Sequence, residues 1–118
     1  LKNTVKYGGR VLGAFIDGKL KGFASVEGIL LGTKNQYADL SCIHVSQDVR
    51  RMGIGSRLFE NVIIFAKKLG AEKLYISAHS AVETQSFYKA MGCVEAAEYI
   101  KEHTQKDPFD CQLEYYLE

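Results

Sequence analysis

In the first third of the chain, successive residues suit opposite faces of a β-sheet. The alternation starts at Arg10, and Asp17-Gly18 is the dipeptide most typical of a tight type I′ hairpin turn. A return strand is predicted from Lys19 to about Leu31, and a third strand covers about residues 37–45 after the polar turn 32–36. We therefore expect an antiparallel meander of three strands.

After residue 45 the apolar residues recur at spacings of three and four, which is the period of an amphipathic helix. This pattern predicts a helix from Ser56 to Leu69, and Gly70 stands where a left-handed residue commonly ends a helix. A short strand is predicted over residues 73–78. Because a helix connects it to the third strand, the two strands should lie parallel, joined by a right-handed crossover.

The last part of the chain predicts one more helix and two more strands. The helix begins at Ser80, whose Ser-x-x-Glu spacing is that of a capping box, and Gly92 ends it after Met91. The strands cover residues 93–100 and 110–117, with a charged loop between them. The order β-β-β-α-β-α-β-β predicts an α/β (α+β) fold with a mixed, mostly antiparallel sheet.

Length and composition fit one globular domain over residues 1–118. The 15 Lys and Arg against 14 Asp and Glu leave a formal charge of +1, and 47% of the residues are hydrophobic. These values exclude a disordered tail and a polybasic nucleic-acid binder. No apolar run approaches the ~20 residues of a membrane span. No signal peptide opens the sequence, so we expect a cytoplasmic protein without nucleic-acid or membrane partners.

Three cysteines are too few for a disulfide framework or a metal site and are predicted to be small core residues: Cys42, Cys93 and Cys111.

The most informative segment is Arg50-Arg51-Met52-Gly53-Ile54-Gly55, between a strand and the long helix. A helix N-terminus presents unpaired N–H groups and partial positive charge, and glycines let the backbone approach a phosphate closely. The segment therefore predicts a pyrophosphate cradle built from the amides of residues 51–56. The alternative is that the glycines only shape a turn. A P-loop is excluded because no Gly-Lys-Ser/Thr follows, and a dinucleotide fold lacks its third glycine, since Leu58 stands there.

With a second motif, Phe87-Tyr88-Lys89-Ala90-Met91-Gly92, this segment resembles the GNAT superfamily of N-acyltransferases, which use acetyl coenzyme A. The first motif matches the family's Arg/Gln-x-x-Gly-x-Gly/Ala loop and the second its aromatic-Tyr element ending in glycine. The family often carries Asn where this chain has Ala81. The family also begins with a strand and two helices, whereas about nine residues precede the first hairpin here. We expect either a chain truncated at its N-terminus relative to the family or an unusually open acceptor site.

The resemblance implies that the third and fourth strands splay apart and that pantetheine lies in the gap, paired with the backbone of residues 43–45. The pyrophosphate would rest on residues 51–56, and a strand amide near Ile43 or Val45 would polarise the thioester carbonyl. Acetyl-CoA would be the cosubstrate, with no metal. The implied cofactor-binding residues are Ile43, His44, Val45, Arg50, Arg51, Met52, Gly53, Ile54, Gly55, Ser56 and Tyr88.

The resemblance also implies two catalytic residues, Tyr88 and Asp39. The hydroxyl of Tyr88 would protonate the departing thiolate; the alternative is an aromatic residue packed on the sheet. Asp39 lies eleven residues before Arg50, where some family members carry a catalytic glutamate. A carboxylate there can take a proton from an amine, directly or through water. The alternative is that Asp39 is a solvent-facing strand residue, and Glu27 or water alone could serve as the base.

The three histidines offer weaker candidates. His44 and His79 stand near the ends of two adjacent strands, but no third residue has the spacing of a metal ligand. His79 could line the gap between the strands, and His103 is predicted to be solvated in the charged loop.

We expect transfer of acetyl from acetyl-CoA to a primary amine by direct attack, without a cysteine nucleophile. The alternatives are a non-catalytic CoA-binding sensor or interaction module and, more weakly, a structural partner domain. A near-neutral chain does not select among small-molecule amines, amino acids, aminoglycoside-like drugs and protein N-termini as acceptors. The edges of a short open sheet are compatible with a homodimer.

Overall fold

The computed structural model describes residues 2–118 and has one mixed sheet of six strands in the order β1-β2-β3-β4-β6-β5. Only β3 and β4 are parallel, and the other neighbours are antiparallel, as predicted. The strands are β1 (Arg10–Ile16), β2 (Lys19–Val26), β3 (Tyr37–Val45), β4 (Lys73–Ala78), β5 (Val94–Glu95) and β6 (Cys111–Tyr116). The helices are α1 (Lys2–Lys6), the 3-10 turn η1 (Gln47–Val49), α2 (Ile54–Lys68), α3 (Val82–Met91) and α4 (Lys101–Lys106).

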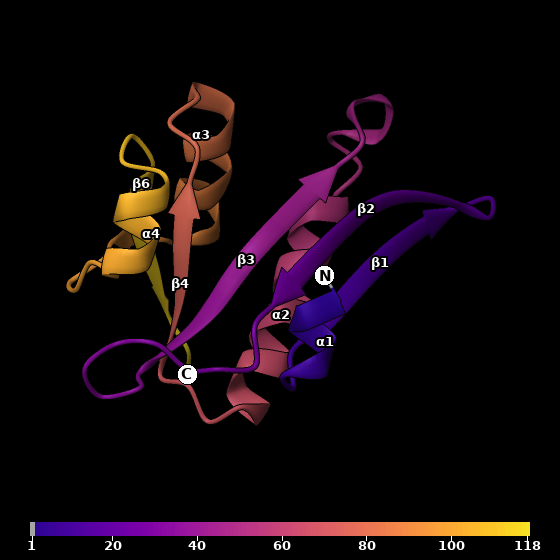
Figure 1. The fold of residues 1–118 in the computed structure, drawn as a ribbon. Coiled ribbons are helices and arrows are strands. Elements are labelled where there is room, and N and C mark those ends of the chain that lie inside the picture. Colours follow the sequence, from indigo (N-terminus) through magenta and orange to yellow (C-terminus); the bar gives the residue numbers. More distant parts are fainter. Residues whose placement is uncertain (1) are drawn as a thin grey trace.

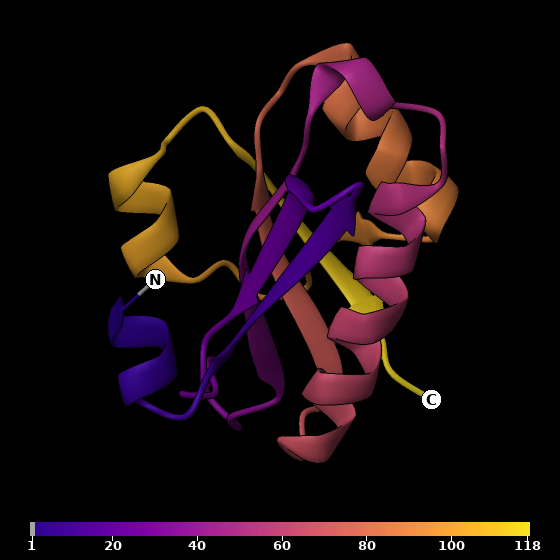
Figure 2. The same ribbon diagram turned by 90° about the vertical axis from the view of Figure 1, so that its right-hand side faces the viewer.

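The elements form three layers, with the sheet in the middle (Figures 1 and 2). Helices α2 and α3 cover one face, and the short helices α1 and α4 lie on the other. The main core lies under α2, whose apolar stripe packs on β2, β3 and β4. The buried residues of that stripe are Leu58, Phe59, Val62, Phe65 and Ala66. Helix α2 begins two residues earlier than predicted, and Gly70 follows it with φ +85°.

The first hairpin agrees with the sequence, but its return strand is shorter. Asp17 and Gly18 both have positive φ, 51° and 77°, as a type I′ turn requires. Strand β2 ends at Val26 rather than near Leu31, and residues 27–36 form a loop joined to β3 by a bridge from Leu31 to Tyr37. The strand ends here because Gly28 lies directly against the backbone that follows α1.

This close approach makes Gly28 a sensitive position. A methyl group at Gly28 would overlap the carbonyl oxygen of Tyr7 and lie 2.7 Å from the amide nitrogen of Gly9, and backbone atoms cannot move aside as side chains can. We expect Gly28→Ala to lower the free energy of unfolding by about 1–3 kcal/mol, measured by urea denaturation. Gly13→Ala is the matched control, because its methyl would meet only the ends of the Phe15 and Leu20 side chains. Equal losses in both variants would contradict this explanation.

The parallel pair at the centre of the sheet is very short. Only residues 37–39 of β3 pair with residues 73–75 of β4, and beyond them the two strands diverge. Figure 1 shows the result as two arms, one with β1, β2 and β3 and the other with β4 and β6, that meet at one end and open toward the other. This is the splayed central pair that the family resemblance implied.

The C-terminal part differs most from the prediction. The strand expected over residues 93–100 is only two residues long, and the charged loop contains the helix α4. The chain leaves the sheet because the amide of Ala97 donates to the Glu114 side chain at 2.9 Å, and the amide of Ile100 donates to the Tyr75 hydroxyl at 3.0 Å. A second small core forms beside α4 from Tyr37, Tyr75, Ala96 and Ile100, the last of which is the N-cap residue of that helix.

Helix α3 begins without the predicted capping box. Its N-cap is Ala81, which makes no side-chain cap. Instead, Nδ1 of the exposed His79 accepts the amide hydrogen of Ala81 at 3.1 Å, and Nε2 of Gln85 donates to the His79 carbonyl at 2.7 Å. Gly92 ends the helix with φ +97°, as predicted.

Two further features complete the description. Cys93 is buried, as predicted, while Cys42 and Cys111 are half-buried, and all three are free thiols. Within residues 2–118, none of the helices combines the length and the apolar character needed to cross a bilayer.

Candidate functional site

A cavity of about 760 Å³ lies at the open end of the gap between β3 and β4. This volume is in the range of small-molecule and cofactor sites. Every predicted cofactor-binding residue lines it except Met52, whose side chain is 62% exposed. The lining residues are Ile43, His44, Val45, Val49, Arg50, Arg51, Gly53, Ile54, Gly55, Ser56, Glu83, Thr84, Ser86, Phe87 and Tyr88.

Strand β3 presents free backbone groups to this gap. The amide of Ser46 donates to the carbonyl of Lys21 in β2 at 2.7 Å, so residue 46 faces β2. Backbone polar groups alternate between the two edges of a strand, so His44 also faces β2, and Ile43 and Val45 face the gap. A register shift between β2 and β3 near Ser41 means that this alternation does not extend to the residues of β3 before Ser41. The gap edge can therefore accept an extended ligand as an additional strand.

The N-terminus of α2 forms a second part of the cavity wall. Its N-cap is Gly53, which has no side chain to cap the first turn, and the first helical hydrogen bond comes from the amide of Arg57 to the Gly53 carbonyl at 3.1 Å. Within the described chain, no amide of residues 51–56 donates to another protein group. These free amides, together with the helix dipole, suit an anion.

The backbone of this loop is held in an unusual conformation. Arg51 has φ +73° and Gly53 has φ +79°, both in the left-handed region. A non-glycine residue such as Arg51 adopts this region at a cost of about 1–2 kcal/mol. Arg50 and Arg51 are exposed and line the cavity, where their guanidinium groups can pair with phosphate oxygens.

Gly55 allows α2 and α3 to meet at the cavity. A methyl group at Gly55 would lie 2.9 Å from Cε1 of Phe87 and 3.7 Å from the Val45 side chain. Phe87 also packs edge-to-face on Phe59 of the core, with ring centroids 6.4 Å apart. Gly55 therefore shapes the wall, and Phe87 packs between the wall and the core.

Tyr88 lies on the same helix, is buried, and lines the cavity. Burial raises the pKa of its hydroxyl above the usual value, so the group stays protonated at neutral pH. No hydrogen bond joins this hydroxyl to another residue within the described part of the chain. The hydroxyl is therefore available as a proton donor to a group in the cavity.

Sequence reasoning missed several polar residues of α3 that line the cavity. Thr84 lies four residues before Tyr88, so helical periodicity puts it on the same face, and this signal was available in the sequence. Val49 lines the cavity from η1. The additional residues of α3 are Glu83, Thr84 and Ser86.

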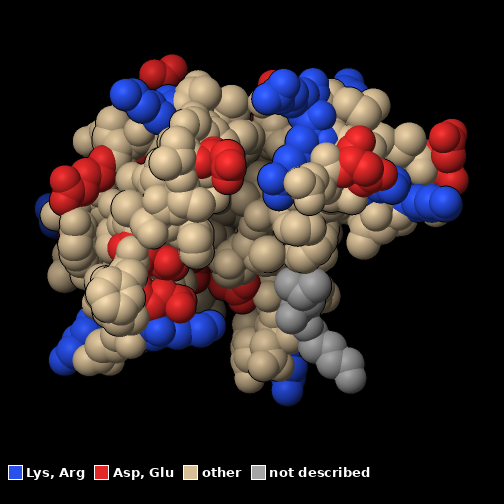
Figure 3. Space-filling view, turned by 90° about the horizontal axis from the view of Figure 1, so that it is seen from above, with Lys and Arg blue, Asp and Glu red and all other residues tan. Residues whose placement is uncertain are grey.

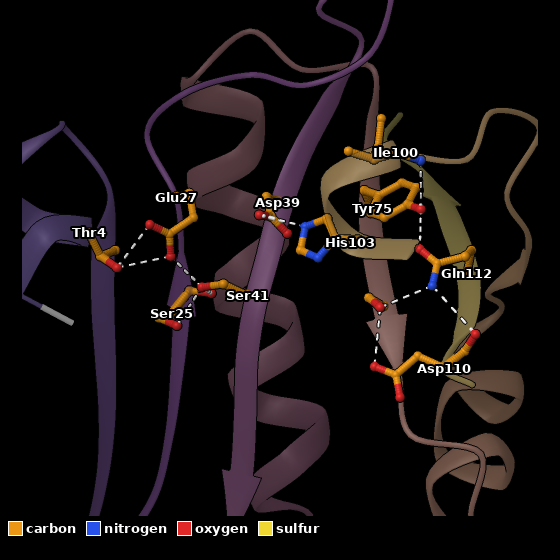
Figure 4. A network of polar contacts seen from close by, with 11 residues as sticks. Thr4, Ser25, Glu27, Asp39, Ser41, Tyr75, Ile100, His103, Asp110 and Gln112 are labelled. Carbon is orange, nitrogen blue, oxygen red and sulfur yellow. Dashed lines mark hydrogen bonds and ion pairs between the residues drawn. The ribbon is translucent and has the colours of Figure 1, made fainter. Parts of the chain in front are cut away.

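Asp39 lies away from the cavity lining, at the closed end of the gap (Figure 4). Its side chain does not face solvent: the residue is 8% exposed, and Oδ2 lies 3.0 Å from Nε2 of His103 on α4. His103 is accordingly half-buried, and the expectation that it is solvated was wrong. The carboxylate of Glu27 is occupied by the hydroxyls of Thr4 and Ser41.

Charge is unevenly distributed around the opening. In the view from above, Lys and Arg side chains crowd one part of the rim of the hollow between the two arms, and acidic side chains are visible in its depth (Figure 3). The basic rim suits a phosphorylated ligand, and the acidic interior suits a cation. Within residues 2–118, no three His, Cys, Asp or Glu side chains come together as a metal site.

Comparison with protein families gives one match. A family model described as "Acetyltransferase (GNAT) family" matches residues 3–93. A search of curated proteins by sequence found no match.

Comparison with solved structures finds many similar folds. An acetyltransferase of the GNAT family from Staphylococcus aureus Mu50 aligns with a TM-score of 0.82 at 19% identity, covering 99% of this chain and 73% of its own. An N-acetyltransferase from Thermoplasma acidophilum, in complex with coenzyme A, aligns with a TM-score of 0.71 at 21% identity, covering 92% and 60%. A GNAT family acetyltransferase from Elizabethkingia anophelis with acetyl-CoA bound aligns with a TM-score of 0.71 at 18% identity, covering 98% and 80%. At these identities the likeness shows a shared fold.

Proposed function

Since the chain belongs to the GNAT family of acetyltransferases, we propose that it transfers acetyl from acetyl-CoA to a primary amine by direct attack. The observation that carries the proposal is the cavity that joins three features: the free edge of β3, the uncapped N-terminus of α2 and the buried hydroxyl of Tyr88. Each suits a different part of acetyl-CoA, namely the pantetheine amides, the diphosphate and the sulfur.

The proposed binding mode follows the cavity wall. The amides of residues 51–56 and the two arginines hold the diphosphate. The free backbone groups of Ile43 and Val45 pair with pantetheine, and one of these amides donates to the thioester carbonyl oxygen. Acetyl-CoA supplies an acyl carbon made electrophilic by its thioester bond.

The amine must be neutral before it can attack. An amine with a pKa of about 10.4 costs on the order of 4–5 kcal/mol to deprotonate at pH 7. We assign this proton to Asp39, and because Asp39 lies outside the cavity lining, a water molecule carries the proton to it.

The transfer step then balances in bonds and protons. The amine nitrogen bonds to the acyl carbon and the carbon–sulfur bond breaks. The hydroxyl of Tyr88 gives its proton to the departing sulfur, and the tyrosinate is restored by the second proton of the nitrogen. The first proton leaves Asp39 for solvent, so the net release is one proton for each ammonium ion acetylated.

Two measurements test this proposal together. Acetyl-CoA is titrated into the protein by calorimetry, and release of free thiol is followed with panels of small amines, amino acids, aminoglycosides and peptides. We expect binding and amine-dependent thiol release. Binding without thiol release across all panels would favour the non-catalytic CoA-binding module, and absence of binding would contradict both.

The role of Asp39 has its own test. We expect Asp39→Asn to lower kcat about tenfold or more at neutral pH, because the amide cannot accept a proton. The deficit should shrink as the pH approaches the pKa of the amine, where the free amine needs no base. Asp17→Asn is the control, because Asn tolerates the positive φ of that hairpin turn. A deficit that is independent of pH would contradict the assignment.

A further inference from the structure

We propose that His103 is a positioning residue for acetyl transfer: it holds Asp39 through Oδ2 and leaves Oδ1 for the water that brings the amine's proton. This inference rests on the proposed function, and it gives the short helix α4 a role at the closed end of the gap, where Asp39 lies.

The contact between the two side chains has a defined direction. A carboxylate only accepts hydrogen bonds, so at 3.0 Å from Oδ2 the Nε2 atom of His103 carries the hydrogen. The other oxygen, Oδ1, is buried and has no hydrogen-bond partner in the described part of the chain. An unpaired buried carboxylate oxygen is costly, and such an atom in a native structure points to a water molecule or ligand donor that completes it.

The ring of His103 is itself held in place from behind. It stacks on the ring of Tyr75, with centroids 5.4 Å apart and an interplanar angle of 28°. The hydroxyl of Tyr75 donates to Gln112 and accepts the amide hydrogen of Ile100, the N-cap residue of α4 (Figure 4). These contacts tie the imidazole to β4, β6 and the start of α4, so the Asp39 carboxylate has one supported orientation.

The charge of His103 then affects the same proton transfer. The carboxylate of Asp39 raises the pKa of the imidazole above the usual value, against the effect of burial; Lys106 opposes this shift and Asp107 supports it. Tyr75, the other titratable group that contacts the His103 ring, stays neutral at neutral pH because burial raises its pKa further. A protonated imidazole opposes the arrival of a further proton at Asp39, whereas the neutral ring keeps the Nε2–H bond. Turnover should therefore rise as His103 loses its proton, above pH 6.5.

The kinetic test compares two substitutions with different chemistry. Gln can place an N–H donor where Nε2 stands but does not titrate, and Ala removes the donor. With n-butylamine as surrogate acceptor, we expect His103→Ala to lower kcat about tenfold with KM for acetyl-CoA unchanged. His103→Gln should restore most of kcat and lose the rise in rate above pH 6.5. Gln105→Ala, on the exposed side of α4, is the control and should change neither.

A spectroscopic measurement covers the case in which n-butylamine is not acetylated. Nitrogen-15 histidine NMR of the full chain should show His103 titrating above its usual pKa, and Asp39→Asn should bring that value down. An unshifted His103, or a His103→Gln enzyme that keeps the wild-type pH profile, would overturn the inference and leave coenzyme binding intact. Loss of acetyl-CoA binding by the wild-type chain would instead overturn the proposed function.

Discussion

Replacement of Tyr88 by phenylalanine is expected to lower kcat about 100-fold while the Kd for acetyl-CoA stays within about twofold. The side chain lines the cavity, and its buried hydroxyl is kept protonated by a raised pKa. Phenylalanine keeps the packing and removes the proton that the departing sulfur needs. The effect should therefore appear in steady-state thiol release and be absent from a calorimetric titration.

Tyr116→Phe is the matched control for this substitution. That tyrosine is 61% exposed on the last strand, and its loss of a hydroxyl should change neither kcat nor Kd. If Tyr88→Phe retained full turnover, the sulfur would have to receive its proton from another source, and the catalytic assignment of Tyr88 would be wrong.

The second large effect concerns the anion site at the start of α2. We expect Gly53→Val to weaken acetyl-CoA binding roughly 30-fold or more, equivalent to the loss of at least one charge-assisted hydrogen bond worth about 2 kcal/mol. Gly53 lines the cavity, and a side chain there enters open space, since no heavy atom lies within 4 Å of its Cβ position. The side chain would stand where the backbone must approach the diphosphate.

The chain supplies a close control in Gly18. It has φ +77° against +79° for Gly53, and its Cβ position is equally open, but it lies in the β1–β2 hairpin turn. Gly18→Val should lose similar stability, because both substitutions force a branched residue into the left-handed region. Equal stability losses with weakened binding in Gly53→Val alone would support the cradle. Unchanged binding in Gly53→Val would contradict it.

The parts of the fold that local chemistry determines were predictable from the sequence. The turn at Asp17-Gly18, the strand over residues 37–45 and the glycine ends of α2 and α3 each have a signal within a few residues. The free amides at the start of α2 were predictable for the same reason, because the first turn of a helix leaves its N–H groups unpaired and Gly53 has no side chain to cap them.

The rest depends on contacts between residues far apart in the chain. The strand expected over residues 93–100 is cut to two residues, because Glu114 and the hydroxyl of Tyr75 take amides that a strand would have paired, and α4 forms in the charged loop that follows. Asp39 and His103 lie 64 positions apart in the sequence, so no local spacing of residues predicts their contact. The shortness of β2 likewise follows from the approach of Gly28 to the segment after α1.

The three-residue parallel pairing of β3 and β4 has a thermodynamic consequence. Beyond these residues β3 and β4 are not paired with each other. An acetyl-CoA molecule bound in the proposed mode would occupy the place of a strand between them. Binding of that kind is linked to folding, since the ligand stabilises only the native chain, by about 2.7 kcal/mol at a free concentration of 100 times Kd. The resistance of this small domain to heat and proteases would then follow the coenzyme supply of the cell.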